Sequence, residues 1–177
     1  MKCRKKLIAL IVLVAVLVLG IGYAVVSSVA LTITGTASMK SVNLNVGFNG
    51  TVSSDVSHAT TGATATGSNT GTSSVGVDSA TIEVTNLANV GDYVEVTYTV
   101  QNYETDVDAT VYVSSIDNNK DTYFQVTTDA TGSANKKSVA KNNGTNTVKV
   151  TVTLIARPTQ TADNEANITV HLTADPA

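Results

Sequence analysis

The chain has 177 residues, of which 42% are hydrophobic and only 14% are charged, and its formal net charge is −3. Thr and Val contribute 28 and 27 residues, and both are β-branched, which disfavours helices and favours sheets. This composition argues against a helical bundle, a coiled coil or a basic nucleic-acid-binding protein. The single Cys excludes a disulfide-stapled scaffold and a cysteine zinc site.

A basic segment and a long apolar run begin the chain. An almost continuous apolar run from Leu7 to Val26 follows four basic residues, Lys2, Arg4, Lys5 and Lys6. This arrangement is typical of an export signal, and the run is also long enough for one membrane-spanning helix. We therefore expect residues 1–27 to form a hydrophobic helix that serves as a signal peptide or a membrane anchor.

Two positions fit cleavage of this signal. The triplets at 22–24 and 28–30 place small residues at the −3 and −1 positions, so a signal peptidase would cut after Ala24 or Ala30. The rest of the chain then has no Cys and holds seven Lys and Arg against 14 Asp and Glu, a net charge of −7. An acidic chain of this kind is not expected to bind nucleic acid, or a membrane other than through its N-terminal segment.

The segment after the apolar run, residues 25–38, reads VVSSVALTITGTAS. Val29, Leu31 and Ile33 alternate with small or polar residues, which is the pattern of a β-strand. No charged residue and no Pro interrupts it. Such a strand either pairs within its own domain or adds to the edge of a neighbour's sheet. Addition to a neighbour is a head-to-tail contact that does not close, so it builds a filament.

The same period-2 alternation recurs along the rest of the chain. Apolar and polar residues alternate in six stretches, at 42–48, 81–85, 93–100, 109–113, 148–154 and 168–173. Each such strand has one apolar and one polar face, and two sheets can bury their apolar faces against each other. We expect residues 28–177 to form a single all-β domain, an antiparallel two-sheet sandwich in which helix is limited to short turns.

Two segments interrupt this pattern. Residues 53–76 consist largely of Ser, Thr, Gly and Ala, and they cannot offset their ordering entropy by burial. We expect a long mobile loop there, either as a plain spacer or as a site of O-glycosylation or ligand contact. Residues 114–146 contain turn signals at 117–121 and 142–144.

One short acidic pattern resembles the start of a calcium loop. Asp117, Asn119 and Asp121 have the D-x-N-x-D spacing of such loops. The pattern then departs from the motif, because Thr122 stands where Gly is needed and Thr128 where Glu is needed. A plain polar turn is the favoured interpretation, and the three residues are weak calcium candidates.

Catalytic chemistry is sparse. Glu104, Asp106 and Asp108 form an acidic cluster that is expected to be a solvated loop. His58 and His171 are far apart in the sequence, and neither belongs to an H-E-x-x-H motif. We predict no enzymatic activity and no cofactor.

A family resemblance rests on several short motifs. The signal ends in G-Y-A and is followed by the β-prone segment. Residues 87–92, LANVGD, form a Gly-Asp turn before a long strand that ends at Gln101-Asn102, and two alternating strands close the chain. This arrangement resembles the TasA/camelysin family of secreted biofilm-matrix fibre proteins. The resemblance implies a jelly-roll-like sandwich, an extracellular location, and homopolymers formed by donor-strand exchange, with Val29, Leu31 and Ile33 as donor side chains.

Two other interpretations stay open. An uncleaved N-terminal helix would make the protein a monomeric, membrane-anchored surface or adhesion module. The other alternative is a camelysin-like metalloprotease, since camelysin is described as a metalloprotease. The sequence has no recognisable zinc site, so the resemblance by itself does not carry that activity over.

Overall fold

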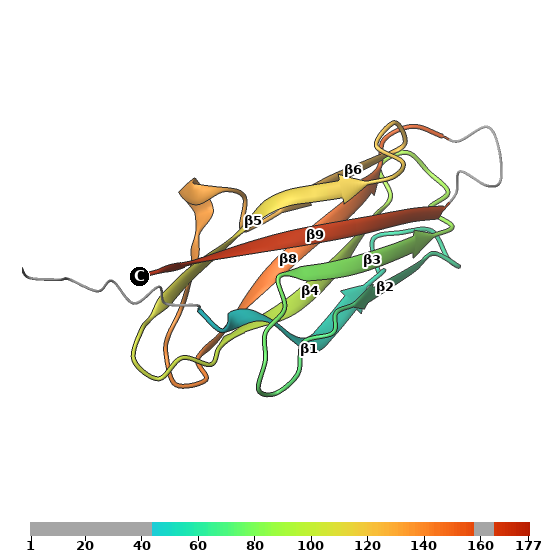
Figure 1. Ribbon diagram of the computed structural model, residues 1–177. Coiled ribbons are helices and arrows are strands. Elements are labelled where there is room, and N and C mark those ends of the chain that lie inside the picture. Colours follow the sequence, from blue (N-terminus) through green and yellow to red (C-terminus); the bar gives the residue numbers. More distant parts are fainter. Residues whose placement is uncertain (1–43, 158–164) are drawn as a thin grey trace, which may run out of the picture. The chain divides into compact units, whose positions relative to one another are not determined.

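The computed structural model describes residues 44–157 and 165–177 (Figure 1). The expected signal peptide or anchor, the cleavage positions Ala24 and Ala30, and the donor residues Val29, Leu31 and Ile33 lie outside the described residues. No helix within the described ranges is long and apolar enough to cross a membrane.

The described part of the chain is almost entirely β-structure, with one short 3-10 turn, η1 (Ser133–Asn135). Its strands are β1 (Val46–Asp55), β2 (Thr64–Ser68), β3 (Ser79–Thr85), β4 (Tyr93–Asn102), β5 (Ala109–Asn118), β6 (Phe124–Thr128), β7 (Lys137–Val139), β8 (Thr145–Leu154) and β9 (Glu165–Pro176). All six predicted strand positions are confirmed, although the first strand starts at Val46 within the described residues.

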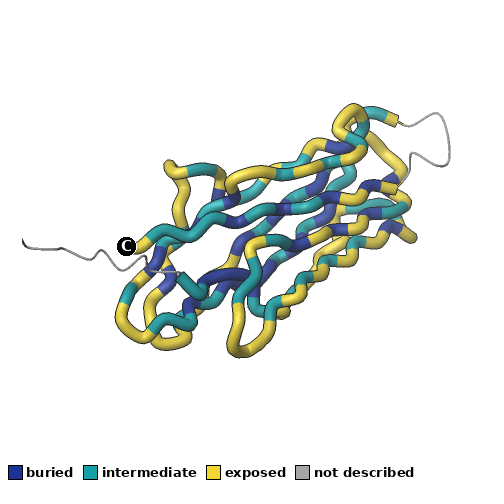
Figure 2. Tube along the Cα trace, viewed as in Figure 1, coloured by how far each residue is buried: buried dark blue, intermediate teal, exposed yellow. Residues whose placement is uncertain are grey.

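The strands form two antiparallel sheets. One sheet has the order β1-β4-β8-β6, and the other has the order β2-β3-β9-β5-β7. The sheets face each other across a shared apolar core, as Figure 2 shows by the alternation of buried and exposed positions along the strands. The predicted all-β, antiparallel two-sheet architecture is therefore confirmed.

Strand β4 shows how the sequence builds this core. Its burial alternates residue by residue along its whole length, and its inward side chains are Val94, Val96, Tyr98, Val100 and Asn102. The Tyr98 ring lies 5.1 Å from that of Phe48, and its hydroxyl donates to the Thr81 carbonyl of the opposite sheet over 2.7 Å. This burial raises the pKa of the Tyr98 hydroxyl well above its ordinary value.

The prediction of a loop at 53–76 is wrong in part, because the segment contains the end of β1 and all of β2. Strand β2 pairs with β3 through its backbone, which requires no large side chains. At Gly67 a Cβ would lie only 2.6 Å from Val96 and 3.0 Å from the Tyr98 hydroxyl. Small residues therefore let this strand pack closely over the core.

The interpretation of 114–146 as an interruption is also wrong in part. Strand β5 continues to Asn118, and β6 and β7 follow within the segment. A β-bulge between Val113 and Ser115 changes which residues face inward, so a constant period of 2 misses the second half of β5. The turn predicted at 117–121 begins only at Asn119. The turn predicted at 142–144 is present, and Asn142 and Asn143 adopt positive φ angles of 60° and 65°.

Candidate functional site

The three calcium candidates make separate contacts in the structure. The Asp117 carboxylate lies 3.0 Å from His171 Nε2 on the exposed face of the sheet. Asn119 Oδ1 accepts the backbone N–H of Asn167 over 2.9 Å, and Asp121 is contacted by the hydroxyl of Thr122. Among the described residues no group of three or more His, Cys, Asp or Glu side chains could hold a metal ion. The geometry thus gives the calcium interpretation no support.

The acidic cluster at 104–108 stabilises the end of the sandwich. Glu104 Oε1 accepts the backbone N–H of Asn45 over 2.8 Å, and Asp108 Oδ1 accepts that of Lys141 over 2.9 Å. These carboxylates satisfy loop N–H groups that are far from them in the sequence. Their role in the structure is to join loops.

Asn102 is the polar residue at the centre of this end. It is completely buried, and its Nδ2 donates to the carbonyls of Val107 (2.9 Å) and Val139 (3.2 Å). Its Oδ1 accepts the N–H of Glu104 over 2.9 Å. Because a buried amide without partners is costly, this set of bonds specifies Asn at the last position of β4.

Asp92 has a similar role at the opposite end of β4. Its Oδ2 accepts the Thr60 hydroxyl over 2.5 Å and the backbone N–H groups of Thr60, Ala88 and Asn89. Gly91, at φ +98°, supplies the turn that aims this carboxylate. The hydrogen bond from the Thr60 hydroxyl, followed by that from the Asn89 N–H, lowers the pKa of Asp92 below its ordinary value of 3.8.

The edges of the two sheets differ in how they are covered. Residues 69–77, here called the strap, lie along the first half of β1. The backbones of Phe48 and Val77 exchange hydrogen bonds of 2.8 and 3.1 Å, and Asn69 Oδ1 accepts the N–H of Gly50. Glycines at 47, 71 and 76 permit this backbone contact, because a Cβ at each would overlap the facing chain.

On the opposite side of the sandwich, β5 and β6 lie close together but belong to different sheets (Figure 1). Strand β7 pairs only with Ala109–Val111 of β5. We use the name seam for the two edges beyond it, residues 113–118 of β5 and 124–128 of β6.

The backbone of the seam carries unused hydrogen-bonding groups. Asn119 donates its N–H to Asn167 of β9, and hydrogen-bonded positions alternate along an antiparallel strand. Ser115 and Asp117 therefore point their backbones toward β9, and Ile116 and Asn118 point theirs toward the seam. No described residue donates to or accepts from the backbone of Ile116 on that side.

The edge of β6 is more fully satisfied. Ile155 donates its N–H to the Tyr123 carbonyl, so by the same alternation Phe124, Val126 and Thr128 face away from β8. The Phe124 carbonyl accepts Asn118 Nδ2 over 2.7 Å, and the Thr128 carbonyl accepts the Thr131 hydroxyl over 2.9 Å. Side chains thus already cap both ends of this short edge.

Two cavities open along the seam. One, of about 370 Å³, is lined by residues that include Val113, Ile116 and Val126. The other, of about 350 Å³, is lined in part by Ile116, Phe124 and the exposed Ile155. Ile116 and Val126 pack against the core but remain partly exposed. The seam is therefore a hollow between two strand edges, lined by apolar side chains together with Ser, Thr and other polar side chains.

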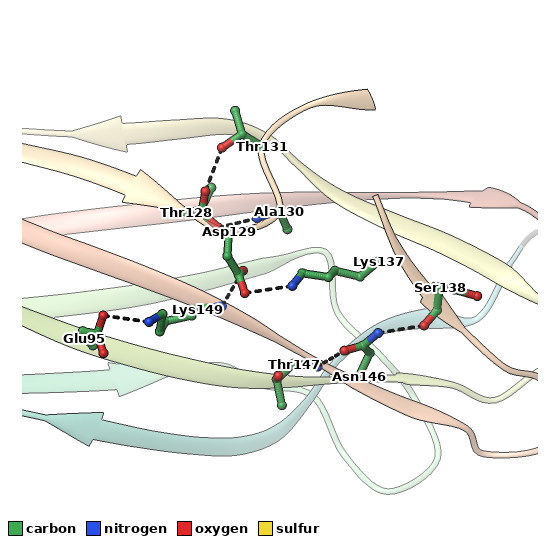
Figure 3. A network of polar contacts seen from close by, with 10 residues as sticks. All are labelled: Glu95, Thr128, Asp129, Ala130, Thr131, Lys137, Ser138, Asn146, Thr147 and Lys149. Atoms are coloured by element: carbon green, nitrogen blue, oxygen red, sulfur yellow. Dashed lines mark hydrogen bonds and ion pairs between the residues drawn. The ribbon is translucent and has the colours of Figure 1, made fainter. Parts of the chain in front are cut away.

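A polar network holds the end of the seam next to Thr128, where the chain crosses from β6 to β7 (Figure 3). Asp129 accepts the Lys137 ammonium (2.9 Å) and the backbone N–H of Lys149 (2.9 Å). The Lys149 ammonium in turn lies 2.8 Å from Glu95, and this hydrogen bond raises the pKa of Lys149. The crossover is thus joined to both β8 and β7 by polar contacts.

No protein-family model matches the chain, and no curated protein or solved structure is detectably similar to it. The sequence interpretation missed Ile116 and Val126 because they lie in a segment assigned to turns. The alternation of Phe124 and Val126 with Gln125 and Thr127 is a signal that could have identified β6.

Proposed function

We propose that the protein is a secreted structural subunit of an extracellular fibre or biofilm matrix, assembled by N-terminal donor-strand exchange. One observation carries the proposal. Residues 25–38 read as a charge-free, β-prone strand, and the described residues form a two-sheet body with a shared apolar core. A strand of this kind supports assembly by adding to the sheet of another copy.

The physical chemistry of such an addition is favourable. Each backbone hydrogen bond of the new ladder contributes about 0.5–1.5 kcal/mol net. Burial of Val29, Leu31 and Ile33 contributes about 1.5–3 kcal/mol for each side chain. Part of this is lost in ordering the strand and in bringing two molecules together. The remainder gives a stable junction between copies.

The resemblance to the TasA/camelysin family supports the same function. In this proposal the sandwich is jelly-roll-like, and removal of the N-terminal signal by a signal peptidase frees the donor strand outside the cell. The two polar residues at the ends of β4, Asp92 and Asn102, belong to the stretch that carries the resemblance. The chain has no catalytic step in this proposal.

Charge substitutions on the two faces of the donor strand test this proposal. Leu31→Asp or Ile33→Asp places a charge on its apolar face, and we expect either change to abolish polymers while the monomer stays soluble. Thr32→Lys is the control, because it places a single charge on the opposite face and should leave polymers intact. Sedimentation of the secreted protein measures the outcome. Normal polymers from the Leu31 and Ile33 variants would rule out donor-strand assembly.

The membrane-anchored monomer is the competing outcome of the same experiment. In that case the unaltered protein stays with the membrane fraction and shows no polymer, and all three variants behave alike.

A further inference from the structure

We propose that the free half of β5 is the acceptor for the donor strand of a second copy, which adds to sheet β2-β3-β9-β5-β7 in line with β7. This inference rests on the proposed function and assigns it a binding site. The occupant is residues 29–33 of another molecule, with Val29, Leu31 and Ile33 directed into the hollow between Ile116 and Val126.

A comparison of how far each edge strand is already covered favours this position. The strap occupies the first half of β1, and β7 offers only three residues. The cavity of about 240 Å³ beside β2 is lined mostly by polar residues, among them Thr66, Ser68 and Glu83. On the inner side of β2, Gly67 lies too close to Val96 and Tyr98 to leave room for an inserted side chain. Beyond Val113, β5 has neither a neighbouring strand nor a covering loop among the described residues.

The backbone then selects β5 over β6 within the seam. Ile116 and Asn118 both present an N–H and a C=O to the open side, which is the alternation that an added strand needs. On β6 the carbonyls of Phe124 and Thr128 already accept side-chain hydrogen bonds. Strand β6 therefore covers the inserted side chains and does not pair with the donor.

The side chains of donor and acceptor are complementary. The larger cavity is lined by Val113, Ile116 and Val126 together with five Ser and Thr residues, and the donor residues that alternate onto one face are aliphatic. The segment from 25 to 39 has no charge, so the donor carries no charged group into the seam. Ala30, Thr32 and Thr34 would then lie on the outer face beside the exposed Ser115 and Asp117.

The linker between the donor segment and the described body is residues 34–44, which span up to about 36 Å when extended. The donor segment is therefore long enough to reach the seam of its own chain as well as that of another. The proposed function commits the strand to a second copy, because insertion into its own body would leave nothing to join two subunits. The disulfide experiment distinguishes the two cases.

Disulfide trapping tests this assignment. The chain without residues 1–24 has no Cys, so single cysteines can be placed freely on exposed positions. We would mix Thr32→Cys chains with Ser115→Cys chains, and separately with Asp117→Cys chains, to cover both registers. The control partner is Thr66→Cys, an exposed position on β2, the opposite edge strand of the same sheet.

We expect fibres in all mixtures, and at least about tenfold more cross-linked dimer with Ser115→Cys or Asp117→Cys than with Thr66→Cys, because a disulfide needs Cα atoms within about 7 Å. Fibres that do not cross-link at either β5 position would overturn the seam assignment and leave the fibre proposal standing. An intramolecular disulfide in the Thr32→Cys, Ser115→Cys double variant would show insertion within one chain and overturn the second-copy assignment. Monomers without fibres would overturn the proposed function itself.

Discussion

Thr60 donates its hydroxyl to the Asp92 carboxylate over 2.5 Å and so joins the loop after β1 to the start of β4. The same carboxylate oxygen accepts three backbone N–H groups, that of Thr60 and those of Ala88 and Asn89 in the loop before β4. All of these donors favour the ionised carboxylate, which is why the pKa of Asp92 is lowered.

This lowered pKa predicts an acid-dependent loss of stability. A carboxyl whose pKa is lower in the folded state stabilises the fold above its unfolded pKa, and the contribution is lost as the pH falls through the folded value. We expect the melting temperature of the protein to fall below about pH 4 more steeply than that of Asp92→Asn. Melting curves between pH 7 and pH 2 measure this, and parallel pH profiles for the two proteins would contradict it.

Asn102 predicts a large loss of stability when its amide is removed. Asn102→Leu keeps a similar volume but leaves the Val107 and Val139 carbonyls and the Glu104 N–H without their partner. We expect a loss of about 3 kcal/mol in the free energy of unfolding. Asn146→Leu is the matched control, since its Nδ2 donates to Ser138 on the exposed surface. Equal losses from both variants in urea unfolding would be incompatible with this role.

Adding one methyl group to the strap should loosen its contact with β1. In Gly71→Ala the new Cβ would overlap the Phe48 carbonyl oxygen, so the strap must move away from β1. We expect a loss of about 1–3 kcal/mol and faster hydrogen exchange at the amides of Phe48 and Val77, which now bond to each other's carbonyls. Ser73→Ala, in an exposed part of the strap, should change neither. Unchanged exchange in Gly71→Ala would show that the strap is not held by this contact.

Charge placed in the seam should block assembly without unfolding the body. Ile116→Lys introduces an ammonium at the partly exposed hollow, where the long side chain can keep its charge in water. We expect a folded monomer that forms no fibres. Val90→Lys adds the same charge at a valine that is 58% exposed in a loop outside the seam, and it should polymerise normally. Fibres from Ile116→Lys would argue against the seam as the acceptor.

The two-sheet architecture could be predicted because the long strands carry uninterrupted alternation. In β4 every second residue from Val94 to Val100 is apolar, and each of these side chains is buried. His171 lies on the polar face of β9 for the same reason, and its ring lies 3.0 Å from the Asp117 carboxylate.

The seam could not be predicted in this way, because the bulge after Val113 breaks the alternation before Ile116. Strand β2 was missed since its inward positions, Ala65 and Gly67, are too small to give an apolar pattern. The role of Asn102 depends on loops that contact it from distant parts of the sequence. No local pattern records such a contact.

Electron microscopy of negatively stained protein tests the assembly mechanism most directly. The comparison is between purified residues 25–177 and a truncated chain that begins at Met39, which retains every described strand. We expect fibres from the longer chain and folded monomers from the shorter one. Fibres from both chains, or monomers from both, would contradict assembly through residues 25–38.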